Sequence, residues 1–136
     1  MLDDATIKQL QSHWEEGWNA YDLETIMAPM GEDVVFSSPF VSTLTGDPAQ
    51  TTVDGYAALR AYVADSLVRV PGISYTLDTT YAGPDTVILA YTFRLPDGTE
   101  KTGADFMRVG AGGKVAEWRS HYRFAAADVN EFIKDL

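Results

Sequence analysis

Hydrophobic positions near the start of the chain recur at steps of three and four residues, the spacing of one face of an α-helix. The stripe consists of Ile7, Leu10, Trp14, Trp18 and Tyr21. It predicts an amphipathic helix that begins at Asp3 or Asp4, either of which can cap it. Gly17 lies inside this helix at a cost of about 1 kcal/mol relative to alanine. We therefore expect another segment to pack closely against it.

Two further segments have helical spacing. Asp22 can cap a short helix over residues 23–28, and Asp54 can cap a longer one. The hydrophobic stripe of the longer helix is Tyr56, Leu59, Val63, Leu67 and Val70. Both segments are followed by proline and glycine, which end helices.

The hydrophobic period changes from 3.6 to 2 after the third helix, which is typical of strands. Extended segments are predicted at 33–39, 73–81, 87–95, 104–109 and 115–124. Residues 40–53 are rich in Thr, Ser, Gly and Pro and predict a loop. Asp97-Gly98 predicts a two-residue type I′ hairpin turn, because that turn needs positive φ values. A short amphipathic segment follows at 128–136.

Helices followed by a meander of strands predict an α+β fold, with the helices on one face of an antiparallel sheet. A long, twisted sheet that curls around three helices leaves a conical interior. We therefore expect residues 1–136 to form a single domain: a curved antiparallel sheet wrapped around three N-terminal helices, with an interior cavity.

Composition excludes several classes of function. The chain has 136 residues, no cysteine and a net charge of −10. Without cysteine there is no disulfide and no thiolate nucleophile or ligand. The negative field opposes binding to nucleic acid or to an anionic membrane. The acidic N-terminus lacks a signal-peptide pattern, and two histidines make a histidine-rich metal site improbable. We expect a cytoplasmic protein with no metal and no cofactor.

The sequence resembles the nuclear transport factor 2-like superfamily, which includes ketosteroid isomerases and SnoaL-like polyketide cyclases. The resemblance rests on residues 18–26 and 33–39, on the helix that contains 55–60, and on the hairpin 105–119. It covers roughly residues 5–124 and implies a cystatin-like α+β roll. The fold hosts enzymes, binding proteins and scaffolds, so it does not by itself indicate a function.

The resemblance also implies positions for the ketosteroid isomerase site. The carboxylate base of that family falls at Ser38, its oxyanion-hole tyrosine at Trp14, and its protonated aspartate at Asp105. A serine cannot remove a proton from carbon without a base of its own, so that isomerase mechanism is not expected here. A Trp N–H can still donate a hydrogen bond to a ligand oxygen.

Asp105 is the candidate catalytic residue, and its surroundings admit two interpretations. Apolar neighbours on its strand favour burial in the cavity, where desolvation raises the pKa of a carboxyl group. Alternatively, Asp105 lies on the surface or pairs with Arg94 or Arg108. A two-residue turn at 97–98 would place Asp105 opposite Ala90, on the face away from the aromatic residues. A bulge at Gly103 would reverse that parity.

The last strand alternates two sets of side chains, which strand geometry puts on opposite faces. We expect Trp118, Ser120 and Tyr122 to face the interior, because burying the other set would cost more. Glu117, Arg119, His121 and Arg123 would then face solvent or a partner subunit, and the reverse would make a basic anion pocket. The favoured arrangement predicts a homodimer through the outer face of the sheet. His13 lies off the first helical stripe and is predicted to be solvated.

Aromatic residues at the inward positions predict a ligand pocket or, alternatively, a filled core. The ligand-binding candidates are Trp14, Trp18, Ser38, Tyr62, Tyr91, Phe93, Trp118, Ser120 and Tyr122. Trp and Tyr carry polar groups that need partners when buried, which favours a mostly apolar site for a small hydrophobic ligand. Phe40, Val41 and Leu44 could close over its mouth, or the loop could be exposed and mobile.

The residues thus favour binding of a small hydrophobic molecule, with cofactor-free proton transfer next to a carbonyl if the protein is an enzyme. Asp105 would be the acid or base, and Trp14, Ser38 and Tyr122 would position the ligand oxygen. The alternative is a non-catalytic binding or dimerisation module with the same fold.

Overall fold

The computed structural model describes residues 2–123, which form four helices and six strands. The helices are α1 (Asp4–Ala20), α2 (Leu23–Met27), α3 (Val41–Thr45) and α4 (Tyr56–Arg69). The strands are β1 (Met30–Ser37), β2 (Thr52–Asp54), β3 (Ser74–Ala82), β4 (Thr86–Arg94), β5 (Glu100–Val109) and β6 (Val115–Tyr122). The segment at 128–136 and the final residue of the predicted last strand, Phe124, lie outside the described residues.

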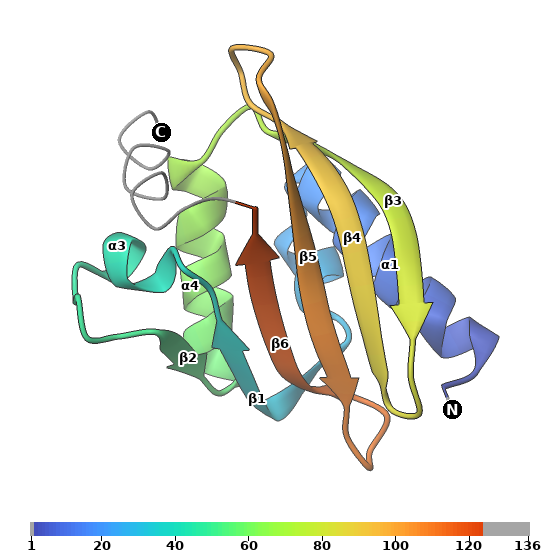
Figure 1. The fold of residues 1–136 in the computed structure, drawn as a ribbon. Helices are drawn as coiled ribbons and strands as arrows, with labels where there is room; N and C mark the ends of the chain where they lie inside the picture. Colours follow the sequence, from blue (N-terminus) through green and yellow to red (C-terminus); the bar gives the residue numbers. More distant parts are fainter. Residues whose placement is uncertain (1, 124–136) are drawn as a thin grey trace.

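The six strands make one sheet in the order β2-β1-β6-β5-β4-β3 (Figure 1). Neighbouring strands are antiparallel except β1 and β6, which run parallel with Phe36 opposite Trp118. The prediction of an α+β fold with a curved sheet is confirmed, whereas the prediction of a wholly antiparallel sheet is wrong at this pair. The long connection between β1 and β6 leaves the chain enough length to return in the same direction.

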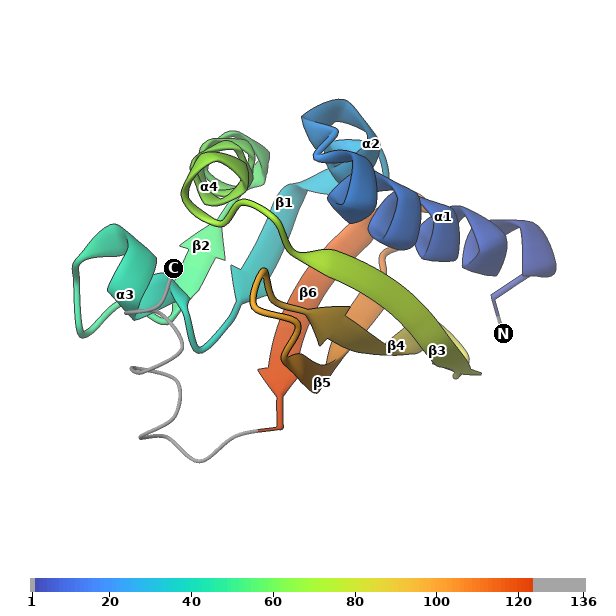
Figure 2. The same cartoon turned by 90° about the horizontal axis from the view of Figure 1, so that it is seen from above.

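Three of the helices cover one face of the sheet (Figure 2). Helix α1 packs on β3, and α4 packs on β1. A register shift between Leu77 and Thr79 inserts an extra residue into β3 opposite β4. Such a bulge bends a strand, and here it curves the edge of the sheet toward α1. The concave face and the helices together enclose the hydrophobic interior.

The close approach predicted at Gly17 is present. A Cβ atom at this position would lie 2.8 Å from the Ile26 side chain and 3.1 Å from the Ile26 backbone nitrogen. Ile26 belongs to α2 and is fully buried. Glycine therefore lets α2 pack directly on the backbone of α1, which sets the angle between the two helices.

The loop predicted at residues 40–53 contains two short elements. Helix α3 buries Val41, and β2 pairs with β1 with Val53 opposite Phe36. The prediction is wrong there because tertiary packing of Val41 and Val53 outweighs the local loop composition. Asp54 ends β2, and Gly55, with φ of 91°, precedes α4 in the place predicted for an Asp54 cap.

The hairpin between β4 and β5 differs from the prediction, and the difference determines which face of the sheet Asp105 lies on. Leu95 N–H donates to Thr99 C=O and Gly98 N–H donates to Leu95 C=O, so the loop has three residues, 96–98. Gly98 has φ of 89°. Pro96 is restricted to negative φ and suits the first central position of a type I turn. The extra residue shifts the register by one and pairs Asp105 with Leu89 rather than Ala90.

No helix among residues 2–123 is long and apolar enough to span a membrane.

Candidate functional site

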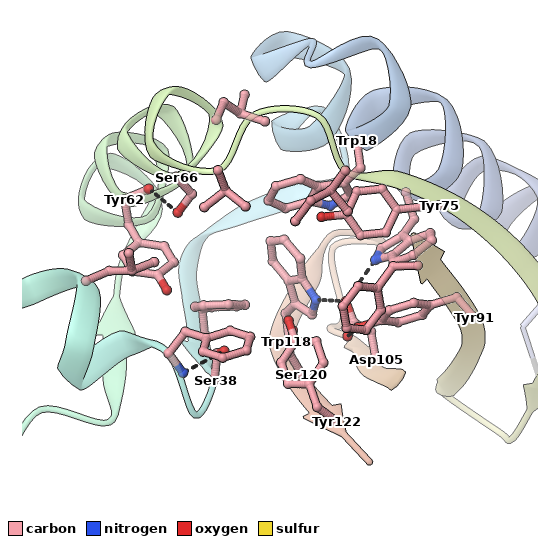
Figure 3. Close-up of a pocket in the computed structure, with 18 of the residues that line it drawn as sticks. Trp18, Ser38, Tyr62, Ser66, Tyr75, Tyr91, Asp105, Trp118, Ser120 and Tyr122 are labelled. Carbon is pink, nitrogen blue, oxygen red and sulfur yellow. Dashed lines mark hydrogen bonds between the residues drawn. The ribbon is translucent and has the colours of Figure 1, made fainter. Parts of the chain in front are cut away.

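A pocket of about 90 Å³ opens between the concave face of the sheet and the helices (Figure 3). All of the residues predicted to line a site lie on its wall: Trp14, Trp18, Ser38, Tyr62, Tyr91, Phe93, Asp105, Trp118, Ser120 and Tyr122. Phe40 and Leu44 also reach it, whereas Val41 is buried in the core beneath them. The aromatic interior therefore holds an opening rather than being completely filled.

Asp105 is the carboxylate at the centre of this wall, and only 2% of its surface is exposed. It lies in a row of directly paired residues, Leu89, Asp105 and Ser120, on three adjacent strands. Of the two interpretations that the sequence left open for Asp105, the structure has the buried one. The reason is the three-residue turn, not a bulge at Gly103.

Four hydrogen-bond donors surround the Asp105 carboxylate, three of which, Tyr91, Trp118 and Ser120, are labelled in Figure 3. The indole N–H groups of Trp14 and Trp118 donate to Oδ2 at 2.8 and 2.9 Å. The Tyr91 hydroxyl donates to Oδ1 at 2.9 Å, and Ser120 also hydrogen-bonds the carboxyl group. An indole nitrogen can only donate, so Oδ2 is an acceptor in every protonation state. Any proton that Asp105 takes up must reside on Oδ1.

Burial raises the pKa of Asp105, while its hydrogen bonds from Trp118, Trp14, Tyr91 and Ser120 oppose the rise. The alternative of an arginine-paired surface residue is wrong. Arg94 pairs with Glu100, and Arg108 pairs with Glu117. Hydrogen-bond donors thus replace a cation around this carboxyl group, and burial, the largest influence on its pKa, leaves that pKa raised.

Gly103 shapes the site by having no side chain. A Cβ atom there would lie 2.9 Å from both Cζ and the hydroxyl oxygen of Tyr91, and 2.8 Å from His121 C=O. Tyr91 is directly opposite Gly103 on β4, and its ring crosses this space to reach Asp105. The sequence suggested a bulge at Gly103, whereas in the structure the missing side chain of Gly103 leaves the space that the Tyr91 ring occupies.

The Trp14 indole is oriented by Asp105. Its single N–H donates to the carboxylate, so in this structure it is not available to a ligand oxygen. Its ring packs on Tyr91 with centroids 4.2 Å apart and on Tyr75 with centroids 5.4 Å apart. Trp14 is therefore a wall residue and a partner of Asp105.

The Ser38 hydroxyl oxygen accepts a hydrogen bond from the Phe40 N–H at 3.2 Å, at the far side of the pocket from Asp105.

Sequence reasoning missed part of the pocket wall. The lining residues that were not predicted are Tyr21, Phe36, Ser66, Leu67, Val70, Ile73 and Tyr75. Tyr75 reaches the pocket from β3, and burial raises its pKa.

His13 lies outside the pocket wall but is 3% exposed, so the prediction that it is solvated is wrong. Its Nδ1–H donates to Ile26 C=O at 2.8 Å, and its Nε2 is buried without a partner among the described residues. Spacing could have revealed it, because His13 lies three residues after Leu10 and four before Gly17.

The two faces of β6 are arranged as predicted. Trp118, Ser120 and Tyr122 line the pocket. On the convex face, an open groove is lined by Ile88, Ala104, Phe106, Glu117, Arg119 and His121. Glu117 bridges two strands, since it pairs with Arg119 at 2.6 Å and with Arg108 at 3.7 Å.

No group of three or more His, Asp or Glu side chains within residues 2–123 is placed to hold a metal ion.

A curved mixed sheet, helices over its concave face and an aromatic pocket between them define the nuclear transport factor 2-like class, which has a cystatin-like fold. A family model described as a SnoaL-like domain matches residues 11–118. The chain belongs to the SnoaL-like domain family.

Solved structures agree on the fold. A SnoaL-like protein of unknown function from Burkholderia thailandensis is 23% identical, with a TM-score of 0.75 over 91% of this chain and 100% of that one. TerC, co-crystallised with polyporic acid, is 17% identical, with a TM-score of 0.74 over 95% and 98%. A protein of unknown function with a cystatin-like fold from Methylobium petroleophilum is 16% identical, with a TM-score of 0.70 over 91% and 80%. Identities this low establish the fold alone, and no curated protein matches the sequence.

Proposed function

We propose that this protein binds a small, mostly apolar molecule in the pocket and transfers a proton at a carbon next to a carbonyl group. One observation carries the proposal: Asp105 is buried on the pocket wall with hydrogen-bond donors but no cationic partner. Burial raises the pKa of the carboxyl group although the donors oppose the rise, and a raised pKa makes the carboxylate a stronger base for taking up and returning a proton.

Under this proposal, one oxygen of Asp105 handles the proton. Because Oδ2 accepts from both indoles, Oδ1 is the oxygen that takes the proton from the ligand carbon and gives it back. Tyr91 and Ser120 hydrogen-bond this carboxyl group and would stabilise either charge state. Ser38 and Tyr122, also on the wall, would position the ligand oxygen.

The size of the pocket restricts the ligand. Its volume of about 90 Å³ is below the roughly 150 Å³ of an engineered protein cavity that holds benzene. Because the pocket is open at its mouth, a single small ring or a short branched chain can occupy it without being fully enclosed, whereas a steroid does not fit without movement of the wall. Together with Ser38 at the position of the base, this argues against ketosteroid isomerase activity. TerC, a protein of the same fold, has been co-crystallised with a small molecule, polyporic acid, which supports a ligand-binding role.

The proposal is tested with cyclopentanone in D₂O. NMR follows both ligand binding and the replacement of hydrogen by deuterium at the carbons next to the carbonyl. We expect the wild-type protein to accelerate this exchange, and Asp105→Asn to bind the ketone without accelerating it. Asp65→Asn makes the same chemical change on the exposed surface of α4, where Asp65 pairs with Arg69, and should exchange like the wild type.

A non-catalytic binding module is the second candidate, and the same experiment separates the two. Binding without accelerated exchange by the wild-type protein would favour the module. Failure of small cyclic ketones to bind at all would contradict the proposed ligand class.

A further inference from the structure

Within residues 2–123, the pocket wall carries one acidic side chain and no basic one. Asp105 is its single carboxylate, and no lysine, arginine or histidine is among the described residues that line it. The arginines on the strands that carry the site are paired elsewhere. Arg94 pairs with Glu100, and both Arg108 and Arg119 pair with Glu117. When Asp105 is ionised, its charge therefore has hydrogen-bond donors but no counter-ion.

The field of that charge acts on the neighbouring phenols. Burial raises the pKa of Tyr91 and Tyr122, and the negative charge of Asp105 adds to the rise at both. Burial also raises the pKa of Tyr75, with a smaller contribution from Asp105. A potential that opposes a second anion in the pocket stabilises a cation at the same place.

Aromatic faces add a second attraction for cations. The Trp14 ring lies against Tyr91 and Tyr75, with centroid distances of 4.2 and 5.4 Å. Trp18 and Trp118 extend this wall, with centroids 6.3 Å apart. Rings packed this closely leave no room between them, but each of them also lines the pocket. The face of an aromatic ring carries negative electrostatic potential, so a desolvated cation in the pocket is attracted by several of them at once.

The hydrogen bonds at Asp105 indicate which cation fits. Oδ2 already accepts from two indoles and Oδ1 from Tyr91. A primary ammonium has three N–H donors that need acceptors, and it would have to displace these bonds. A fully alkylated ammonium has no N–H, so it needs only the charge and the aromatic faces. A head group of this kind also has the few heavy atoms that a pocket of about 90 Å³ admits.

We propose that the pocket selects small alkylated ammonium cations over neutral molecules of the same shape and over anions. The inference rests on the proposed function, because it names the class of molecule that the same pocket prefers. The net charge of −10 attracts cations toward the protein as a whole.

Three probes of equal shape test the proposal by calorimetric titration at pH 8. Choline carries a quaternary ammonium, 3,3-dimethylbutan-1-ol replaces its nitrogen with carbon, and 3,3-dimethylbutanoate is an anion. We expect the wild-type protein to bind choline at least about tenfold more tightly than the alcohol, since both the charge and the rings contribute. The anion should bind more weakly than the alcohol.

Two variants separate the contributions. Asp105→Asn should reduce the choline preference to less than about threefold, because it removes the charge. It keeps the shape: the amide oxygen can accept from both indoles, and the amide nitrogen can donate to the Tyr91 and Ser120 oxygens. Trp18→Leu leaves every hydrogen bond to Asp105 in place and removes one aromatic face, so it should weaken choline binding more than alcohol binding.

Equal or tighter binding of the alcohol by the wild-type protein would overturn the inference, as would binding of none of the three probes. The proposed function fails separately, if cyclopentanone does not bind. The cation inference would also be overturned if the choline preference survives in both Asp105→Asn and Trp18→Leu, because neither the charge nor the ring would then be responsible.

Discussion

A buried carboxyl group with donors but no counter-ion is costly to ionise, and Asp105 is such a group. Desolvation is the largest influence on its pKa and raises it, and the hydrogen bonds reduce the rise without cancelling it. A protein that retains such a group gives up stability at neutral pH. We interpret this as stability exchanged for a proton-transfer or charge-selecting site.

The first prediction concerns Asp105→Asn. A carboxyl group whose folded pKa is above its unfolded value holds protons more tightly when folded, so it weakens the fold once pH rises above the folded pKa. Below the unfolded value the penalty is absent. We expect Asp105→Asn to be at least as stable as the wild type at pH 8, with this advantage shrinking by pH 4. Urea unfolding at both pH values measures it, and a variant clearly weaker at pH 8 would contradict the raised pKa.

The second prediction concerns His13, whose pKa burial lowers to about 4. A histidine that is harder to protonate when folded contributes full stability above its unfolded pKa of about 6.5 and loses it as pH falls toward 4. The loss amounts to roughly 3 kcal/mol. His13→Asn keeps a donor for Ile26 C=O but does not titrate.

We therefore expect the wild type to lose more stability than His13→Asn between pH 6.5 and pH 4. Carboxylates that titrate in the same range do so in both proteins and cancel in the comparison. Parallel pH dependence of the two unfolding free energies would contradict a lowered histidine pKa.

At the scale of residues, the sequence predicted many of the side chains that line the pocket. It did not predict the hydrogen bonds that these side chains make there. Inward positions followed from strand alternation and aromatic type, so Trp118, Ser120 and Tyr122 were placed correctly. Hydrogen-bond partners depend on distances between separate elements, which periodicity does not contain. The engagement of Trp14 by Asp105 and the burial of His13 were both missed for that reason.

Among the elements, the contact between α1 and α2 gives the third prediction. Gly17→Ala gains about 1 kcal/mol of helix propensity. Its methyl group would meet the Ile26 side chain and backbone at distances too short for ordinary contact. We expect a net loss of about 1–2 kcal/mol, because the backbone of a buried element cannot easily move.

Chemical unfolding measures the effect, with Gly112→Ala as the matched control. A Cβ atom at Gly112 would meet nothing within 4 Å, so this change should stay within about 0.5 kcal/mol of the wild type. A Gly17→Ala protein as stable as the wild type would show that the two helices can separate freely.

Elements with strong periodicity were predictable, and those decided by tertiary contact were not. Helices α1 and α4 and strands β3, β4 and β6 followed from hydrophobic spacing. The short α3 and β2 did not, because their polar composition resembles a loop and only the burial of Val41 and Val53 holds them. The turn after β4 was misjudged because Asp97-Gly98 is a strong hairpin signal, while Pro96 moved the turn one residue earlier.

The whole molecule leads to the fourth prediction, a homodimer through the convex face of the sheet. The groove there exposes Ile88, 40% accessible, beside Phe106 and the charged side chains of Glu117 and Arg119. A surface that combines an apolar centre with charges of both signs can pair with a copy of itself about a two-fold axis.

Light scattering coupled to size exclusion should give a dimer mass at ~50 μM, because association depends on protomer concentration. Ile88→Asp should yield monomers. Val68→Asp introduces the same charge at an 80% exposed position on α4, away from the groove, and should remain dimeric. A monomeric wild-type protein would rule out this interface.

Strand β6 is the last strand of the described chain, yet it occupies the middle of the sheet. A chain leaves the ribosome from its N-terminus, so β1 and β2 with α4, and the hairpins β3 to β5, are all synthesised before the strand that joins them. Until residues 115–122 emerge, Asp105 lacks Trp118 and Ser120, and the aromatic wall of the pocket stays open to water. The timing of synthesis therefore makes the candidate site one of the last parts of the protein to form.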